Sequence, residues 1–383
     1  MEFLFAAVLS LLLTVMSVPV IIRLARKFNC LDYPGKRRFH RAVTPRWGGI
    51  AFFLSVIPAV LLTLNLDRTT LSYTISSLIL VVTGMVDDRR QLGWKFKMSA
   101  IAVATALVVF GGGVVVRQIG TISLGTISLG WFSVPFTFIG VIGVTNAMNM
   151  IDGLNGLSAG VSCIAFLFLG IAALQAGNLP MAILCFAFVG TMIGFLRYNF
   201  PRASIFMGDS GSMFLGFSLA VVSIQLTQQG SHAIAPLFPL LVLLVPIFDA
   251  VRLMAVRLLH RGNPFVADKI HMHHLILRNG LSSVRTVLLM WSLVLACGIA
   301  ALAAVDGGSV SLLVAVGAMI AVLAVFVHLL VLRKKAKQYR MRARDLSSAG
   351  RPQTAASPRS RVRDREIPVL VKYAALFMSK LVQ

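Results

Sequence analysis

Aspartates beside apolar segments are the side chains in this sequence best placed to do chemistry. The 383-residue chain has only 13 Asp and Glu. Six aspartates stand at or just beyond the ends of different apolar segments: Asp87, Asp88, Asp152, Asp209, Asp249 and Asp268. Adjacent carboxylates such as Asp87 and Asp88 repel each other and need a positive partner. Mg²⁺ prefers oxygen ligands and suits this group, with Mn²⁺ as the alternative ion. Bound Mg²⁺ in turn suits phosphate chemistry, because it neutralises charge on a transferring phosphoryl group.

The stretch NAMNMIDGLNG, residues 146–156, carries a polar residue at every third position. These residues are Asn146, Asn149, Asp152 and Asn155. A helix would bring them to neighbouring faces, and the glycines at 153 and 156 predict that the helix ends there. Amides and a carboxylate at this spacing offer oxygens to a metal and hydrogen bonds to a base or a sugar. The alternative is a polar helix end that caps itself.

The stretch FMGDSGS, residues 206–212, opens an apolar segment. It is similar to the sequence around the nucleophile of trypsin-like proteases, but that chemistry needs a β-barrel with placed His and Asp partners. Asp209 or Ser210 can instead cap a helix whose free N–H groups attract anions. We therefore predict a metal ligand beside a phosphate-binding helix start.

Three histidines gather in NPFVADKIHMHHLILRNGLS, residues 263–282. His271, His273 and His274 could bind Zn²⁺, but no cysteine or fourth ligand stands nearby. Imidazoles together with Arg278 would instead bind a pyrophosphate. Asp268 and Lys269 could simply pair on the surface.

The motifs lie between long apolar segments that must position them. Hydrophobic residues make up 57% of the chain and charged residues 13%, whereas a soluble domain is about a quarter charged. Eleven segments approach the ~20 residues that a membrane-spanning helix needs, at 3–23, 47–65, 70–86, 98–116, 131–149, 158–176, 180–197, 209–227, 234–252, 286–305 and 310–332. We predict an all-α integral membrane protein with about 11 transmembrane helices. The first segment lacks a basic start, so we expect it to remain as a span.

The formal net charge is +23, and the distribution of the Lys and Arg residues over the loops indicates the membrane topology. If the N-terminus lies outside, the inside loops and the tail hold 34 of the 36 Lys and Arg, and only Arg68 and Arg117 lie outside. This is the positive-inside bias. It predicts a cytoplasmic C-terminus and attraction to anionic lipid and anionic substrates, with no nucleic-acid partner.

The chain divides into a membrane part and a tail. Residues 1–332 form the predicted multi-spanning catalytic domain. The segment 333–366 is rich in Arg, Ser and Pro, so we expect disorder. Residues 367–382 are apolar but short for a span, and they could form an interfacial helix. On the outer side, the repeated TISLG within 117–130 favours a small β-hairpin or a turn-rich loop.

In order along the chain, these motifs resemble the polyprenyl-phosphate N-acetylhexosamine-1-phosphate transferases. The resemblance runs from PGKRRFHRAVTPRWGGI (34–50) to HMHHLILRNGLS (271–282) and includes the eleven-span layout. HxHH followed by LxxRxG is similar to the bacterial branch that uses UDP-GlcNAc and undecaprenyl phosphate. The resemblance implies a site on the cytoplasmic face of the bacterial inner membrane. There the lipid phosphate attacks the β-phosphorus of the UDP-sugar, UMP leaves, and a lipid-linked cell-envelope glycan is begun.

The resemblance also implies roles for individual residues. Asp87 and Asp88 would position or deprotonate the lipid phosphate, and Asp209 with Asn149 or Asp152 would hold Mg²⁺. The expected catalytic residues are Asp87, Asp88, Lys97, Asp152, His271, His273 and His274. The expected substrate-binding residues are Lys36, Arg38, Arg46, Asn146, Asn155, Asp249 and Arg278. The positive-inside bias alone is an alternative explanation for Lys36, Arg38 and Arg46.

One position departs from the family pattern. Bacterial relatives usually read DGxDG where this chain has DGLNG, so Asn155 stands at the second aspartate. Asn still donates and accepts hydrogen bonds, but the donor could be another UDP-N-acetylhexosamine. A secondary transporter is the alternative from another class, although it predicts charges near the midplane and paired broken helices. A homodimer is the oligomeric state that we leave open.

Overall fold

The computed structural model describes residues 1–33, 42–64, 66–122, 125–228, 234–259, 271–305 and 308–349. For residues 121–122, 125 and 334–349 it describes the backbone alone. The chain divides into two units, Met1–Lys334 and Lys335–Gln383. The predicted interfacial helix at 367–382 lies outside the described residues.

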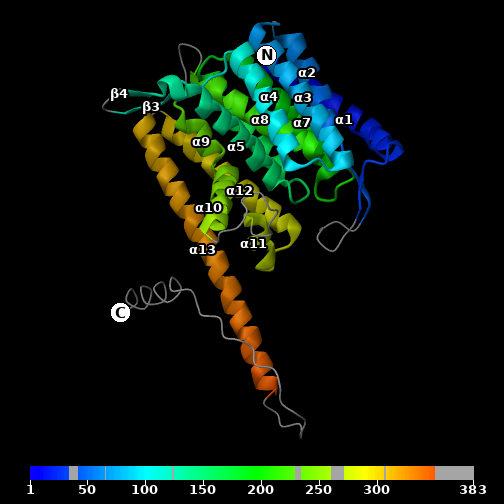
Figure 1. The fold of residues 1–383 in the computed structure, drawn as a ribbon, viewed down its shortest axis with the longest axis vertical. Coiled ribbons are helices and arrows are strands. Elements are labelled where there is room, and N and C mark those ends of the chain that lie inside the picture. Colours follow the sequence, from blue (N-terminus) through cyan, green and yellow to red (C-terminus); the bar gives the residue numbers. More distant parts are fainter. Residues whose placement is uncertain are drawn as a thin grey trace. The chain divides into compact units, whose positions relative to one another are not determined.

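Helices dominate the described chain (Figure 1). In chain order, the first α-helices are α1 (Glu2–Lys27), α2 (Gly48–Thr63), α3 (Arg68–Arg90), α4 (Trp94–Ala106), α5 (Ser133–Ile151) and α6 (Leu157–Gln175). They are followed by α7 (Leu179–Asn199), α8 (Gly208–Gln228), α9 (Leu237–Val242), α10 (Leu244–Leu259), α11 (Met272–Arg278), α12 (Ser283–Val305) and α13 (Gly308–Ala349). A π-helical turn, Leu107–Gly111, extends α4, and a 3₁₀ turn, Gly130–Phe132, precedes α5.

Each predicted apolar segment is mostly helical, although the helix in the segment at 98–116 ends at Gly111. Nine of the described helical segments are long and apolar enough to cross a membrane. The segment at 47–65 forms α2, which has only 16 residues. The segment at 234–252 is broken into α9 and α10 at Leu243. Pro246 explains the break, because a proline has no N–H and its ring clashes with the carbonyl four residues earlier, which here belongs to Val242.

The helix α13 continues past the predicted end of the membrane domain to Ala349. Its extension is rich in Ala, Lys and Arg, which favour helix. The remainder of the tail, residues 350–383, lies outside the described residues.

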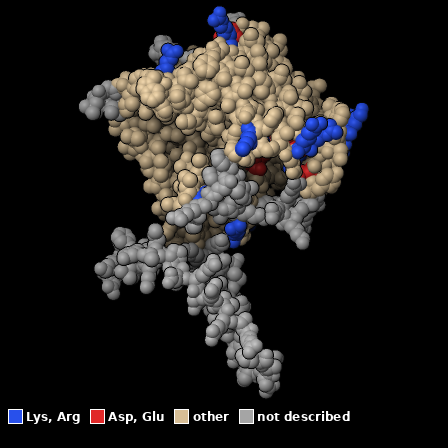
Figure 2. Space-filling model, in the orientation of Figure 1, with Lys and Arg blue, Asp and Glu red and all other residues tan. Residues whose placement is uncertain are grey.

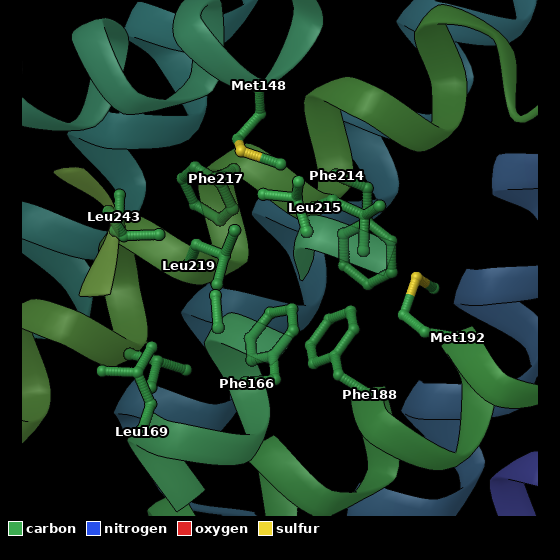
Figure 3. Packing of buried hydrophobic residues seen from close by; sticks show 14 of the residues in the cluster. Met148, Phe166, Leu169, Phe188, Met192, Phe214, Leu215, Phe217, Leu219 and Leu243 are labelled. Atoms are coloured by element: carbon green, nitrogen blue, oxygen red, sulfur yellow. The ribbon is translucent and has the colours of Figure 1, made fainter. Parts of the chain in front are cut away.

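Helix α8 forms the centre of the Met1–Lys334 unit. It is almost entirely buried, and α2, α3, α5, α6 and α7 pack against it. Figure 3 shows its apolar side chains meeting those of neighbouring helices. Phe166 and Phe188 stack with their ring centroids 4.2 Å apart, and Phe188 also contacts Phe214 of α8 at 5.3 Å. Dispersion contacts of this kind fix α8 in place and therefore fix the residues at its two ends.

The outer surface of this unit is largely apolar. Figure 2 shows a face on which Lys, Arg, Asp and Glu occupy only a few places. Large side chains such as Phe110 and Trp131 are 73% and 88% exposed. An exposed apolar surface of this extent fits contact with lipid.

Two antiparallel hairpins lie at opposite ends of α8. Strands β3 (Gln118–Ile122) and β4 (Gly125–Ser128) pair, which confirms the predicted hairpin. The side chain of Gln228, the last residue of α8, accepts from the N–H groups of Arg117 and Gln118. At the other end, β1 (Leu31–Asp32) pairs with β2 (Thr44–Pro45). The N–H of Phe206, just before α8, donates to the carbonyl of Pro45 at 2.8 Å.

Glycines allow neighbouring helices to approach the start of α8 closely. Gly49 of α2 and Gly84 of α3 lie directly against the backbone of Ser210 and Gly211, where a Cβ on either glycine would overlap. This contact brings the last turns of α3, with Asp87 and Asp88, to the first turn of α8.

Candidate active site

Lys97 joins two of the predicted aspartates. From α4, its Nζ donates to Oδ2 of Asp87 at 3.1 Å and to Oδ2 of Asp209 at 3.0 Å. Asp87 belongs to the end of α3 and Asp209 to the first turn of α8. The other oxygen of Asp87, Oδ1, is buried and has no hydrogen-bond partner among the described residues. One ammonium thus serves two carboxylates, and one buried oxygen remains able to accept a further donor or a cation.

Asp88 faces different groups from Asp87. Its Oδ1 accepts from the N–H of Asp209 at 2.9 Å, and its Oδ2 accepts from the hydroxyl of Ser210 at 3.0 Å. The guanidinium of Arg46 lies 3.8 Å from Oδ1, and the Asp88 side chain is 0% exposed. Successive helix positions point about 100° apart, so the adjacent aspartates reach separate partners.

Arg46 connects Asp88 to the short hairpin β1–β2. Its guanidinium lies 3.2 Å from Oδ1 of Asp32. The next residue, Trp47, donates through Nε1 to the carbonyl of Met85 at 3.1 Å, which ties the hairpin to α3. Arg46 therefore brings positive charge to the aspartates from a separate part of the chain.

Asn149 holds Asp209 from the side of α5. Its Nδ2 donates to Oδ1 of Asp209 at 2.7 Å and to the hydroxyl of Ser212 at 2.9 Å. Both oxygens of Asp209 are thus engaged, one by Asn149 and one by Lys97. The amide oxygen of Asn149 is the atom that could join Asp209 in binding a metal.

These groups border a cavity of about 440 Å³. Of the predicted site residues, Arg46, Asp88, Asn149, Asp152, Asn155, Asp209 and His274 line it. Asp152 follows the last residue of α5. Burial, together with the negative charges of Asp209 and Asp88, raises the pKa of Asp152 to about 7. The cavity is therefore lined by carboxyl groups and by the guanidinium of Arg46.

A buried asparagine fixes the loop after α5. Oδ1 of Asn199 accepts from the N–H of Gly156 at 2.6 Å, and its Nδ2 donates to the carbonyl of Ile205 at 2.8 Å. Nδ2 of Asn155 donates to the carbonyl of Pro201 at 3.3 Å. The loop that carries Asp152 and Asn155 is thus bonded to the segment that leads to Asp209.

The three histidines occupy different environments. His274 lines the cavity. His271 is buried, and its Nδ1 lies 3.0 Å from Oδ2 of Asp249. Asp249, which is 2% exposed, also accepts from Arg252 at 2.8 Å and from the N–H of Met272 at 3.0 Å. Asp249 therefore anchors the start of α11 to α10.

His273 packs between the other two imidazoles and Gly153. Neither ring nitrogen has a hydrogen-bond partner among the residues that the structure describes. Burial, with the neighbouring charges of His274 and His271, lowers the pKa of His273 to about 3. His273 is therefore neutral at physiological pH.

The remaining predicted residues lie elsewhere. Asp87 and Lys97 reach the cavity through their contacts with Asp209. Asn146 is half-buried on α5, Arg278 is exposed at the end of α11, and neither lines the cavity. Their substrate contacts, like that of Asp249, stay predictions. Lys36 and Arg38 lie outside the described residues, as do Asp268 and Lys269.

Sequence reasoning missed three residues of the cavity wall. Asp32, Asn199 and Ser283 line the cavity, but none belongs to a recognised motif. Asp32 could have been predicted, because the chain has few acidic residues and Asp32 lies in a predicted inside loop. Asn199 and Ser283 gave no signal, because single polar residues at helix ends are common.

The donor set fits Mg²⁺. Within the described ranges, no three His, Cys, Asp or Glu side chains converge as a metal-binding group. Mg²⁺ does not need such a group, because it keeps several waters and is bound through one or two carboxylates plus substrate phosphates. Asp209, Asn149 and Asp152 offer oxygens of this kind beside one cavity.

Comparison with known proteins gives a consistent family. Residues 70–227 match the model of glycosyl transferase family 4. The chain is 33% identical over 288 residues, 75% of this chain and 80% of the relative, to a probable undecaprenyl-phosphate N-acetylglucosaminyl 1-phosphate transferase of Bacillus subtilis (strain 168). It is 32% identical over 273 residues, 70% of this chain and 75% of the relative, to the undecaprenyl-phosphate alpha-N-acetylglucosaminyl 1-phosphate transferase of Yersinia pestis.

A mycobacterial relative covers still more of the sequence. The decaprenyl-phosphate N-acetylglucosaminephosphotransferase of Mycolicibacterium smegmatis (strain ATCC 700084 / mc(2)155) is 32% identical over 344 residues, which is 80% of this chain and 84% of the relative. The chain therefore belongs to glycosyl transferase family 4, the family that includes these polyprenyl-phosphate sugar-1-phosphate transferases.

Proposed function

We propose that this protein transfers N-acetylglucosamine 1-phosphate from UDP-GlcNAc to undecaprenyl phosphate and releases UMP. The lipid-linked product would begin a cell-envelope glycan. The observation that carries the proposal is the position of Lys97 between Asp87 and Asp209, beside a cavity lined by carboxylates and amides. This arrangement offers oxygen ligands and cations to phosphate groups within one small volume.

The cavity suits the nucleotide sugar. Arg46 carries charge that can bind a phosphate oxygen, and Asn155 carries an amide that can hydrogen-bond a base or a sugar. His274 and Asp152 complete the polar wall. The pyrophosphate of the donor would lie toward Asp209 and Asn149, the residues that would hold the metal.

The acceptor phosphate would approach from the side of Asp87. An oxygen of the lipid phosphate forms a bond to the β-phosphorus, the bond from that phosphorus to the bridging oxygen breaks, and UMP leaves with the electron pair. Asp87, whose Oδ1 lacks a partner among the described residues, would hold or accept the proton of the lipid phosphate. Lys97 would neutralise the charge that the two phosphates bring together.

Mg²⁺ would be held by Asp209 with Asn149 or Asp152, and it supplies charge neutralisation on the transferring phosphate. Mn²⁺ is the alternative ion. The carboxylate of Asp209 then orients the donor, while Lys97 keeps Asp87 close to it.

We also place this cavity on the cytoplasmic face of a bacterial inner membrane, with the N-terminus outside and the C-terminus inside. Helix α8 has 21 residues, so it is about 31 Å long, close to the thickness of the hydrocarbon. The cavity lies at its first turn and the β3–β4 hairpin at its last. The distribution of Lys and Arg in the sequence supports placing the cavity end inside, where the basic loops would also attract anionic lipid.

A related donor is the second candidate. Asn155 lines the cavity, and it stands where the family resemblance described above leads us to expect aspartate. A change of one polar group in a pocket can alter which sugar is accepted. Another UDP-N-acetylhexosamine is therefore the alternative substrate.

Release of UMP by the purified full-length protein tests the proposal. The assay contains undecaprenyl phosphate, UDP-GlcNAc and Mg²⁺, with EDTA, UDP-GalNAc and omission of the lipid as controls. We expect UMP only when lipid, metal and the GlcNAc donor are all present. UMP release with another UDP-sugar but not with UDP-GlcNAc would contradict the choice of donor. No UMP release with any donor would contradict the proposed reaction.

A further inference from the structure

The carboxylate of Asp88 is fully engaged by the start of α8. It accepts from the N–H of Asp209 at 2.9 Å, from the hydroxyl of Ser210 at 3.0 Å and from the N–H of Ser210 at 3.4 Å. These N–H groups belong to the first turn of a helix and have no partners within it. Asp88 therefore caps α8 from a different helix, α3.

Close packing fixes this cap in place. Gly208 has φ of +70°, and a Cβ there would overlap the carboxylate of Asp88. One turn earlier on α3, Gly84 lies against the backbone of Asp209 and Ser210. Asp88 lines the cavity, but its side chain is 0% exposed and its two oxygens point at donors of the first turn of α8.

The neighbouring aspartate is in the opposite situation. Asp87 uses one oxygen to accept from Lys97 and keeps the other without a partner among the described residues. The two adjacent carboxylates therefore differ in whether an oxygen remains without a hydrogen-bond partner. Asp87 has an oxygen for a reacting group, whereas the oxygens of Asp88 already bind protein donors.

We propose that Asp88 is a positioning residue, which acts by holding the backbone of Asp209 and not by exchanging a proton with either substrate. This inference rests on the proposed function, since Asp209 is the residue that would hold the metal and orient the donor. Asp88 acts through hydrogen bonds to Asp209 and Ser210, and its contribution depends on accepting them rather than on taking up a proton. The guanidinium of Arg46 lies near the carboxylate of Asp88 and offsets its buried negative charge.

The conservative variant distinguishes positioning from chemistry. In Asp88→Asn, the amide oxygen can still accept from the N–H of Asp209, and the amide nitrogen can donate to the hydroxyl of Ser210. That hydroxyl can accept when its single hydrogen is donated instead to the carbonyl of Met207, which lies 3.2 Å away. In Asp88→Ala, the donors are left buried without a partner, which is costly.

The experiment measures three quantities for the full-length wild type, Asp88→Asn, Asp88→Ala and Asp87→Asn. These are steady-state UMP release, the Mg²⁺-dependent affinity for UDP by calorimetry, and the melting temperature in detergent. We expect Asp88→Asn to stay within about tenfold of wild type in activity, and Asp88→Ala to lose about a hundredfold in activity together with UDP affinity and melting temperature. Asp87→Asn should lose activity to the same extent while it binds UDP normally.

A second variant covers the case in which Asp88→Ala does not fold. Ser210→Ala removes one donor to Asp88, and we expect it to lower UDP affinity and melting temperature in the same direction but less. The inference is overturned if Asp88→Asn is as inactive as Asp88→Ala while both bind UDP and melt like wild type. It is also overturned if Asp88→Ala keeps full activity. If the wild type releases no UMP, the proposed function fails, but UDP affinity and melting still decide whether Asp88 positions Asp209.

Discussion

The Nζ of Lys97 lies 3.0 Å from Oδ2 of Asp209, a residue 112 positions away in the chain. The same nitrogen contacts Asp87, so this one cation holds the ends of α3, α4 and α8 at a common point. In Lys97→Met, two carboxylates would face each other without it. We expect about a hundredfold loss of UMP release and a lower melting temperature that added Mg²⁺ partly restores.

A matched control for this prediction lies on the same helix. Lys95 is exposed, and Lys95→Met changes the net charge by the same amount. Activity in Lys95→Met should stay near that of wild type. Equal losses in the two variants would show that general charge, and not the contact with Asp87 and Asp209, matters.

Asn199 should affect donor binding more than stability alone explains. Asn199→Ala leaves the buried N–H of Gly156 unpaired, at a cost of about 1–3 kcal/mol. Because this bond fixes the loop of Asp152 and Asn155, we expect KM for UDP-GlcNAc to rise about tenfold or more. Asn178 caps the other end of α7, and Asn178→Ala should cost about 1 kcal/mol of stability with KM unchanged. A rise in KM in both variants would refute the specific role of Asn199.

Asp249 should act through His271. The carboxylate bonds Nδ1 of His271 and the backbone of Met272, so Asp249→Ala would release the start of α11. A hydrogen bond to a charged group contributes about 1.5–3 kcal/mol, and we expect activity to fall about 10- to 100-fold. Asp67→Ala, which removes the cap of α3 at the far end from the cavity, should lower the melting temperature but leave kcat unchanged. If the two variants behave alike, the contact with His271 has no effect on turnover.

The pH dependence of stability should contain a contribution from His273. Its pKa is about 3 in the folded protein and ordinarily 6.5, so the unfolded chain binds the proton more tightly. Stability is therefore lost as pH falls from 6.5 toward 3, by at most about 1.4 kcal/mol for each pH unit. We expect wild type to lose more melting temperature between about pH 7.5 and pH 5.5 than His273→Asn does.

The family assignment decides between the enzyme and the transporter in favour of the enzyme. The positions of most helices follow from the sequence, because a long apolar segment has few alternatives in lipid. Pro246 indicates a helix break near Leu243, but the segment 234–252 is mostly apolar, and its hydropathy alone predicts one continuous span. The sequence alone did not predict the short helix α11 or the hairpin β1–β2, since neither has a clear periodic pattern.

The candidate site was predictable in composition and not in its contacts. Motif residues Asn149, Asp152 and Asp209 do meet at one cavity. The partners of the adjacent aspartates depend on where α4 and the hairpin β1–β2 lie, so Lys97 and Arg46 could be suggested but not assigned. Asn199 is a single buried amide whose two bonds join segments far apart in sequence. No local pattern records such a connection.

The glycine contacts at the start of α8 predict which positions will not tolerate substitution. Gly49, Gly84 and Gly211 have no functional group, yet a methyl group at Gly84 would push α3 away from the start of α8, and one at Gly49 or Gly211 would push α2 away from it. A saturation-mutagenesis library should therefore show its sharpest intolerance at residues that perform no chemistry. Attempts to change the donor sugar should leave these glycines intact and vary Asn155 and Ser283, which line the cavity.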